Sequence, residues 1–304
     1  MPEPETAPAA TPARPLPILR SLRVHQWTKN LLVFVPAVLD HRILDGPVML
    51  GALLAFAAFS LAASGGYVLN DLLDRSADRA HPLRRQRPFA DGSLSTSFGV
   101  MLLLLLFGLA LLLAWLTLPG RFLALLAGYV ILTAAYSAYL KRFVVLDVLM
   151  LAGFYTLRVL AGLAATPVRF STWLIAFSMF LFLSLAFVKR YAELTRLATG
   201  ADSVLARRGY QTSDREWLGT MGAASGYLSV LVLALYINSD EVTVMYRTPM
   251  LLWLLCPVLL YWISRAWLQA HRGRMAEDPI VATLRDPLSY VIGAVAALIL
   301  VAAS

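Results

Sequence analysis

Three aspartates stand at helical spacing within a mostly apolar chain of 304 residues. Asp71, Asp74 and Asp78 are three and then four residues apart, so a helix would place all three carboxylates on one face, with Asn70 beside them. Carboxylates this close repel one another unless a cation lies among them, and Mg²⁺ prefers such oxygen ligands. Three arginines follow closely, namely Arg84, Arg85 and Arg87. The pattern predicts a divalent metal ion that bridges the carboxylates to a phosphorylated substrate, whose charge the arginines share.

The same stretch also has a simpler interpretation. Aspartates among arginines could form a solvated turn next to a membrane, where exposed ion pairs contribute less than about 1 kcal/mol. The helical register from Asn70 to Asp78, followed by the helix-stopping prolines Pro82 and Pro88, favours a built site over that alternative.

The composition indicates that these charges belong to a membrane protein. Hydrophobic residues make up 59% of the chain and charged residues 14%, with a mean hydropathy of +0.70, which is too apolar for a water-soluble globule. The net charge of +8 is typical of topology signals and of contact with anionic lipids. Because no basic patch lies in a soluble domain, we exclude nucleic-acid binding. The single cysteine, Cys256, allows no intramolecular disulfide.

The elements that position the site are predicted to be membrane helices. The hydropathy pattern predicts an all-α, polytopic fold with nine transmembrane helices, each near the ~20 residues that a bilayer requires or somewhat shorter. They lie at about 31–44, 48–69, 97–118, 122–140, 146–165, 173–188, 218–237, 250–268 and 290–303. Residues 1–17 are rich in Pro and Ala and predict a disordered cytoplasmic tail, so 18–304 form one transmembrane domain.

The distribution of cations predicts the orientation of these helices. With the N-terminus in the cytoplasm, most of the 26 lysines and arginines fall on the cytoplasmic side, as the positive-inside rule requires. The long loops 70–96, 189–216 and 264–288 then share that side. We therefore expect an active site that faces the cytoplasm.

Several stretches resemble the UbiA superfamily of intramembrane prenyltransferases, and within it the decaprenyl-phosphate phosphoribosyltransferase branch. They are NDLLDRSAD at 70–78, RVHQWTKNLLVF at 23–34, HPLRRQRPFADG at 81–92, AAYSAYLKR at 134–142, KRYAEL at 189–194 and DPIVATLRDP at 278–287. The resemblance implies a ring of nine helices around a central cavity that is open to lipid and cytoplasm, in a bacterial plasma membrane.

One departure from the prenyltransferase pattern favours the phosphoribosyltransferase branch. Prenyltransferases of this superfamily carry a second aspartate-rich motif after the sixth helix, whereas the acids here, Glu193, Asp202 and Asp214, lack that spacing. The same loop instead offers five cations: Lys189, Arg190, Arg196, Arg207 and Arg208. A basic loop opposite a single acidic motif suits a substrate with several phosphates.

The resemblance therefore implies transfer of phosphoribose from phosphoribosyl pyrophosphate to a polyprenyl phosphate. Mg²⁺ on Asp71 and Asp74, with Asp78 or Asn70, would hold the departing pyrophosphate, and the lipid phosphate would attack C1 of the ribose. Two alternatives stay open. One is a prenyltransferase that joins a polyprenyl diphosphate to an aromatic or other small acceptor, and the other is a transporter or other non-enzymatic membrane protein.

The remaining candidate substrate-binding residues lie in the matching stretches or inside a span. They are Lys29, Tyr136, Tyr139, Lys141, Arg158, Lys189, Arg190, Tyr191 and Glu193. Arg158 is predicted to pair with Asp147 or with a substrate phosphate, because an unpaired charge within a membrane is costly. Lys141 beside two tyrosines could equally be an interfacial anchor, and Lys189 and Arg190 a plain cytoplasmic flank.

Overall fold

The computed structural model describes residues 17–81, 84–198, 209–275, 279–283 and 286–304, and these are helical with short connections and no strand. The predicted tail, apart from Pro17, lies outside this part of the chain, as do Asp202, Arg207 and Arg208. The elements are α1 (Pro17–Leu22), η1 (Val24–Phe34), α2 (Val35–Leu39), α3 (Gly46–Leu73), α4 (Arg75–Arg79), η2 (Arg84–Gln86), α5 (Thr96–Thr117), α6 (Gly120–Ala138), η3 (Leu140–Arg142), α7 (Leu146–Ala165), α8 (Thr172–Ala198), α9 (Asp214–Ile237), α10 (Asp240–Met245), η5 (Pro249–Leu254), α11 (Leu255–His271), α12 (Pro279–Thr283) and α13 (Pro287–Ala303).

Seven of the described helices are long and apolar enough to cross a membrane. They are α3, α5, α6, α7, α8, α9 and the continuous segment formed by η5 and α11. The all-α membrane fold is therefore confirmed, but the predicted count of nine spans is not. The first predicted span divides into η1 and the short α2, with Pro36 at the start of α2 and a left-handed residue, His41, after it. The ninth, α13, is apolar but shorter than the other seven.

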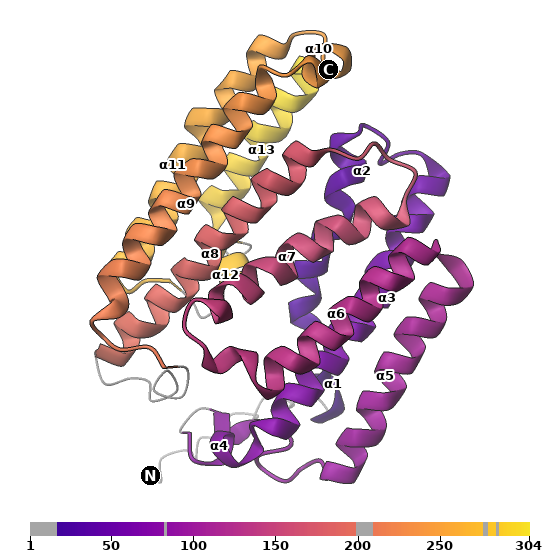
Figure 1. Cartoon of the computed structure of the whole chain (residues 1–304), viewed down its shortest axis with the longest axis vertical. Coiled ribbons are helices and arrows are strands. Elements are labelled where there is room, and N and C mark those ends of the chain that lie inside the picture. Colours follow the sequence, from indigo (N-terminus) through magenta and orange to yellow (C-terminus); the bar gives the residue numbers. More distant parts are fainter. Residues whose placement is uncertain (1–16, 82–83, 199–208, 276–278, 284–285) are drawn as a thin grey trace, which may run out of the picture.

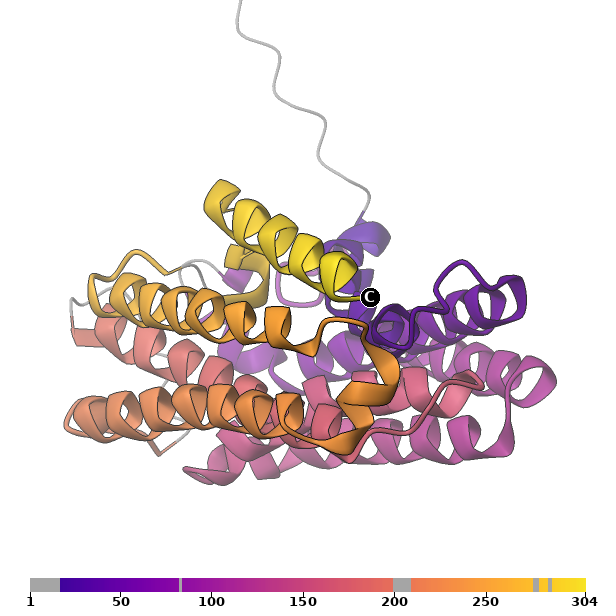
Figure 2. The ribbon, with the colours of Figure 1, turned by 90° about the horizontal axis from the view of Figure 1, so that it is seen from above.

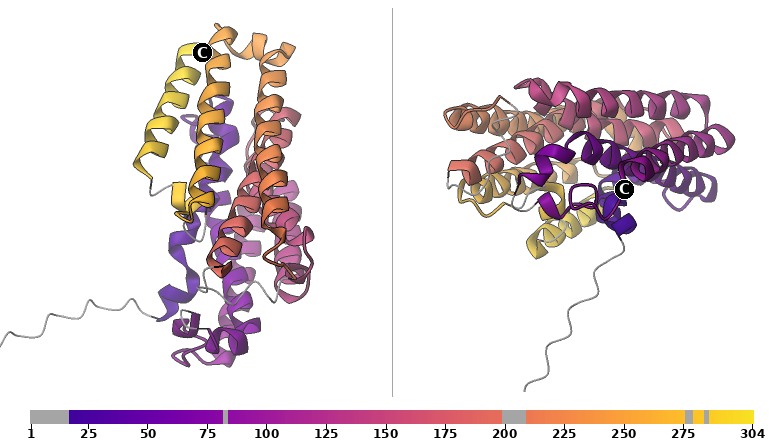
Figure 3. Two further views of the ribbon diagram at one scale, coloured as in Figure 1. Left: turned by 90° about the vertical axis from the view of Figure 1, so that its left-hand side faces the viewer. Right: turned by 90° about the horizontal axis from the view of Figure 1, so that it is seen from below.

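Helices that follow one another in the chain pack side by side, from α3 against α5 to α11 against α13 (Figure 1). η1 packs against both α3 and α7. Seen from above, the helices lie roughly alongside one another, with α13 on one side of the bundle (Figure 2). The end of α6, the end of α8 and the short α4 lie toward one end of the bundle, whereas the C-terminus lies at the other (Figures 1 and 3). We call the end that carries α4, η2 and η3, with their arginines and Lys141, the polar end.

Close packing of η1 against α7 depends on a glycine. A methyl group at Gly162 of α7 would overlap the carbonyl oxygen of Val33 in η1. Glycine thus lets the two backbones meet, which brings Lys29 and Asn30 of η1 against the inner face of α7. On the outside of the bundle, α5 exposes Leu104, Leu116 and other large apolar side chains, as a surface in contact with lipid does.

Candidate functional site

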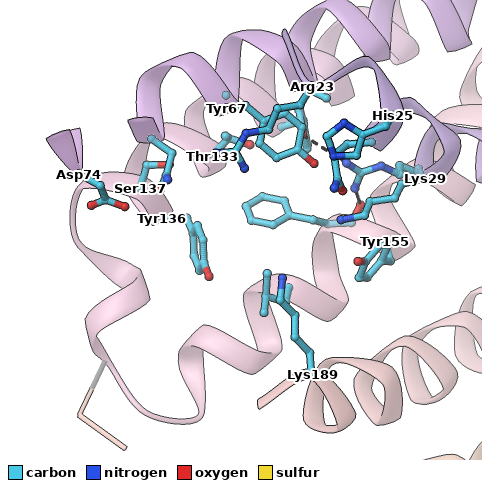
Figure 4. Close-up of a pocket in the computed structure, with 18 of the residues that line it drawn as sticks. Arg23, His25, Lys29, Tyr67, Asp74, Thr133, Tyr136, Ser137, Tyr155 and Lys189 are labelled. Atoms are coloured by element: carbon cyan, nitrogen blue, oxygen red, sulfur yellow. Dashed lines mark hydrogen bonds between the residues drawn. The ribbon is translucent and has the colours of Figure 1, made fainter. Parts of the chain in front are cut away.

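A cavity of about 510 Å³ lies between η1, α3, α6, α7 and α8. Its lining contains many more cations than acids. The cations are Arg23, Lys29, Arg84, Arg87, Arg158, Lys189, Arg190 and Arg196, and the carboxylates are Asp74 and Glu193. Figure 4 shows Asp74 at one side of this space, Lys29 with Tyr155 at the other, and Lys189 reaching toward the space between them. The cavity is thus suited to an elongated polyanion.

Asn70 and Asp74 face the cavity from the last turn of α3, because a separation of four residues places them on one side of a helix. Lys141 reaches them from η3. Its Nζ donates to the two carboxylate oxygens of Asp74 at 2.7 and 2.8 Å and to the amide oxygen of Asn70 at 3.1 Å. These three oxygens therefore already surround a cation.

Asp71 and Asp78 are buried and do not line the cavity. Asp71 accepts hydrogen bonds from Arg23 at 2.6 Å and Arg87 at 3.0 Å, and Asp78 accepts one from Arg87 at 2.7 Å. Burial raises the pKa of the Asp78 carboxyl above its ordinary value, and the charge of Arg87 opposes this shift. The two aspartates and Arg87 form an ion-pair cluster that fixes the turn after α3.

The three predicted metal ligands do not share one helical face. α3 ends at Leu73, and the chain turns at Asp74 before α4 begins, so Asp78 belongs to a different helix. Among the described residues no group of three acidic, histidine or cysteine side chains could hold a metal ion. Asn70 and Asp74 nevertheless fit Mg²⁺, which commonly uses one or two carboxylates together with water and substrate phosphates. Asp71 and Asp78 as ligands stay a prediction.

Arg190 is fully buried, with 0% of its surface exposed. It donates two hydrogen bonds to Asp147, at 2.5 and 2.8 Å, and one to Glu193 at 2.5 Å. The hydroxyl of Tyr136 also donates to Asp147, at 2.6 Å. The prediction that Asp147 could pair with Arg158 is therefore wrong, since Asp147 pairs with Arg190. This network holds Tyr136 and Glu193 at the cavity wall.

Other predicted residues divide between the cavity and positions away from it. Lys29 is buried, and its ammonium lies 5.9 Å from the centre of the Tyr155 ring. Four predicted substrate-binding residues are not among those that line the cavity: Arg85, Tyr139, Tyr191 and Lys141, which is paired with Asp74 and Asn70. Arg85 and Tyr139 are exposed, whereas Tyr191 hydrogen-bonds His271 of α11 at 3.0 Å. The structure thus brings together only part of the predicted set.

Several cavity residues were not predicted from the sequence. Those within the spans are Tyr67 on α3, Tyr129, Thr133 and Ser137 on α6, and Tyr155 on α7, and those before or in η1 are Arg23, His25 and Gln26. Arg196 of α8, one of the five cations noted in the sequence, also lines the cavity. Polar residues recurring every three or four positions in an apolar helix were the available signal. Arg23 is further marked by its left-handed backbone, with φ of 50°, a conformation that costs energy in a residue with a side chain.

Comparisons with known proteins give matches over most of the chain. Residues 32–284 match a model of the UbiA prenyltransferase family. The chain is 39% identical to the nodulation protein NoeC of Azorhizobium caulinodans, over 88% of this chain and 87% of that protein. It is 37% identical to the protein y4nM of Sinorhizobium fredii, over 92% of this chain but 54% of that protein, so it spans about half the length of y4nM.

A further relative and a solved structure extend the comparison. The chain is 33% identical to the decaprenyl-phosphate phosphoribosyltransferase of Mycolicibacterium smegmatis, over 73% of this chain and 71% of that protein. Its fold is similar to that of a UbiA homolog from Archaeoglobus fulgidus bound to GPP and Mg²⁺. That similarity has a TM-score of 0.70 at 17% identity and covers 94% of this chain and 99% of the other.

Proposed function

This chain belongs to the UbiA prenyltransferase family, and we propose that it transfers a 5-phosphoribosyl group from phosphoribosyl pyrophosphate to a polyprenyl phosphate. The observation that carries this proposal is the excess of cations in the cavity lining, where eight lysines and arginines stand against two carboxylates. This excess persists when Arg23, Arg87 and Arg190 are set aside, which pair with the buried carboxylates Asp71, Asp78 and Asp147. The two substrates together bring a pyrophosphate, a sugar 5-phosphate and a lipid phosphate. Their summed negative charge matches the cationic lining, and similarity to the Mycolicibacterium smegmatis enzyme supports the same assignment.

The wall of the cavity formed by α8 carries cations where a second metal site would need carboxylates. The part of α8 that faces the cavity carries Lys189 and Arg196, and its one carboxylate there, Glu193, is paired with Arg190. A wall of this kind attracts phosphate directly through ammonium and guanidinium groups. This wall therefore favours phosphoribosyl pyrophosphate, which carries a 5-phosphate besides its pyrophosphate. A prenyl diphosphate bound between two metal sites would need carboxylates on this wall instead.

The acceptor in the proposed reaction, the lipid phosphate, is already an anion and can attack without an enzyme base. An oxygen of the lipid phosphate forms a bond to C1 of the ribose while the bond from C1 to the pyrophosphate oxygen breaks, and pyrophosphate leaves with both electrons. Asn70 and Asp74 would hold Mg²⁺, which stabilises charge on a departing pyrophosphate. Arg84 and Arg87 bind the pyrophosphate, and Lys189 orients the sugar phosphate. No side chain has to act as a nucleophile.

This proposal places the protein with its polar end in the cytoplasm, where a water-soluble sugar phosphate is available. The lipid phosphate would enter from the bilayer, and its apolar tail would remain among the membrane helices. A bacterial plasma membrane provides both the lipid carrier and this orientation, which agrees with the distribution of cations in the sequence.

Prenyl transfer is the second candidate, and the aromatic lining of the cavity favours it. Tyr67, Tyr129, Phe154 and Tyr155 line the space, and their ring faces could stabilise an allylic cation after a prenyl diphosphate ionises. The A. fulgidus homolog bound to GPP and Mg²⁺ is a structural neighbour of this kind. Both candidates release pyrophosphate, so the donor distinguishes them.

The distinguishing experiment measures pyrophosphate release by the purified protein with Mg²⁺ in lipid nanodiscs. We expect release only when phosphoribosyl pyrophosphate and a polyprenyl phosphate are both present. Release from a prenyl diphosphate with an aromatic acid, and none from the sugar donor, would contradict the proposal and establish the second candidate. Omitting each substrate in turn controls for simple hydrolysis of the donor.

A further inference from the structure

Arg158 is a buried cation at membrane depth. It lies in the second half of α7, about 18 Å along the helix axis from Leu146 at 1.5 Å per residue, and only 5% of its surface is exposed. The surrounding sequence, FYTLRVLAGL, is apolar. A charge in such a position is costly unless an anion or a polar network compensates it, so intramembrane arginines usually mark a ligand site.

The contacts of Arg158 are all with neutral groups. Its Nε donates to the amide oxygen of Asn30 at 2.8 Å, its Nη1 to the carbonyl oxygen of Phe154 at 2.5 Å, and its Nη2 to the hydroxyl of Tyr129 at 3.5 Å. Three aromatic rings surround the guanidinium at 5.5 to 5.7 Å from its central carbon. Within the described part of the chain no carboxylate forms an ion pair with it.

Arg190 provides the internal comparison. Both arginines are buried in transmembrane helices, but Arg190 is neutralised by Asp147 and Glu193, whereas Arg158 has an amide, a carbonyl and a phenol as partners. A guanidinium has five N–H groups, and the described contacts of Arg158 use three, one of them weakly. Two N–H groups are therefore left to bind an anion in the cavity that Arg158 lines.

The surroundings hold the guanidinium ready for such an anion. The amide of Asn30 is oriented by a hydrogen bond from its Nδ2 to Ser60 at 2.9 Å, so its oxygen faces Arg158. Lys29, the neighbour of Asn30, places its ammonium on the Tyr155 ring that Arg158 also contacts. Two cations from different elements thus contact one aromatic ring. Lys29 and Tyr155 lie on the side of the cavity away from Asp74 (Figure 4).

We propose that Arg158, with Lys29 beside it, forms a second phosphate subsite and is the counter-ion of a substrate phosphate monoester at membrane depth. This proposal rests on the proposed function. Phe59, which packs on the guanidinium, is eleven residues before Asn70 in α3, or about 16 Å along the axis. That separation leaves room for a ribose between a pyrophosphate at Asn70–Asp74 and a phosphate at Arg158. The lipid phosphate and the sugar 5-phosphate are both phosphate monoesters, so this subsite could bind either of them.

Ligand-induced thermal stabilisation tests the subsite without requiring turnover. Wild-type protein in detergent is heated with a polyprenyl phosphate or its polyprenol, and separately with ribose 5-phosphate or ribose. We expect a phosphate-bearing ligand to raise the melting temperature more than its alcohol does, and Arg158→Gln to abolish that difference. Arg158→Lys should restore part of it, and Arg169→Gln, an exposed arginine on a connecting loop, should leave it unchanged.

The pair of ligands that shows the difference identifies which phosphate the subsite takes. Because binding is measured directly, a protein that does not transfer phosphoribose could still pass this test, so the two proposals fail separately. The subsite is overturned if phosphate and alcohol stabilise the wild type equally, or if Arg158→Gln keeps the full difference. If Arg158→Gln does not fold, Arg158→Lys is compared with wild type instead. The proposal then requires that the difference in melting temperature between phosphate and alcohol be smaller in Arg158→Lys than in wild type. In an active preparation, Arg158→Gln should raise the KM of the matching substrate about tenfold and that of the other substrate much less.

Discussion

The ammonium of Lys141 lies between the two carboxylate oxygens of Asp74, 2.7 and 2.8 Å away. This contact joins η3 to the end of α3 and places a cation where the sequence predicted a metal. Mg²⁺ binding at Asp74 would have to share or displace this lysine. The proposed metal site therefore depends most directly on Asp74.

Asp74→Asn should reduce Mg²⁺-dependent turnover about a hundredfold or more, because an amide keeps the shape of the side chain but loses the charge that holds a cation. The variant should still insert into the membrane. Turnover measured across a range of Mg²⁺ concentrations checks this, with Asp91→Asn, an exposed aspartate of the following loop, as the matched control. Turnover near that of the control would exclude Asp74 as a metal ligand.

Arg190→Ala should lower the melting temperature of the protein strongly. Removing the guanidinium leaves Asp147 buried without its main partner, and breaking a buried ion pair in this way typically costs about 3–5 kcal/mol. Lys189→Ala, one residue away, is the control. It should leave the melting temperature nearly unchanged and raise the KM for phosphoribosyl pyrophosphate more than for the lipid. Equal thermal effects of the two changes would argue against the buried network.

Gly162→Ala should destabilise the protein and weaken activity, because the new methyl group would push η1 away from α7 and move Lys29 and Asn30. Gly153→Ala in the same helix is the matched control, since open space surrounds that position. The control should be neutral or slightly stabilising, by up to about 1 kcal/mol, through better helix propensity. Melting curves of both variants in one detergent make the comparison, and equal midpoints would contradict the proposed close contact.

Acid should weaken the attachment of α13. Hydrogen bonds from Arg265 hold the pKa of Asp286 below its ordinary value of 3.8. A lowered pKa means that the stabilisation is fully present above the unfolded value and is lost as pH falls through the lower, folded value. Asp286→Asn should therefore lower the melting temperature at pH 7, with a loss of less than about 1 kcal/mol in the free energy of unfolding for this partly exposed pair. The difference in melting temperature between variant and wild type should shrink below about pH 4. A difference that is constant with pH would count against this ion pair.

The sequence was sufficient to predict the membrane fold and the region of the site, because both depend on local patterns. Hydropathy identified the long helices, and Asn70, Asp74, Lys29 and Lys189 do line the cavity. The division of the first span was harder to predict, because η1 is held by packing against α3 and α7 rather than by its own length.

Contacts between distant residues could not be predicted from spacing alone. Arg23 reaches Asp71 across 48 positions of sequence, and Arg190 reaches Asp147 across 43. The turn at Asp74 likewise separates Asp78 from the helical face on which its spacing would have placed it. Which carboxylates bind arginine and which face the cavity is therefore decided by the tertiary structure.

The most direct test of the phosphoribosyl transfer is the identity of the lipid product. Purified protein is incubated with Mg²⁺, polyprenyl phosphate and phosphoribosyl pyrophosphate carrying ¹³C in its ribose, and the extracted lipids are analysed by mass spectrometry, with Asp74→Asn as the inactive control. Phosphoribosyl transfer predicts a polyprenyl phosphate that carries the labelled ribose together with its 5-phosphate, formed in equal amount with pyrophosphate. An unlabelled lipid fraction, from protein that consumes a prenyl diphosphate in a parallel incubation supplied with one, would contradict it.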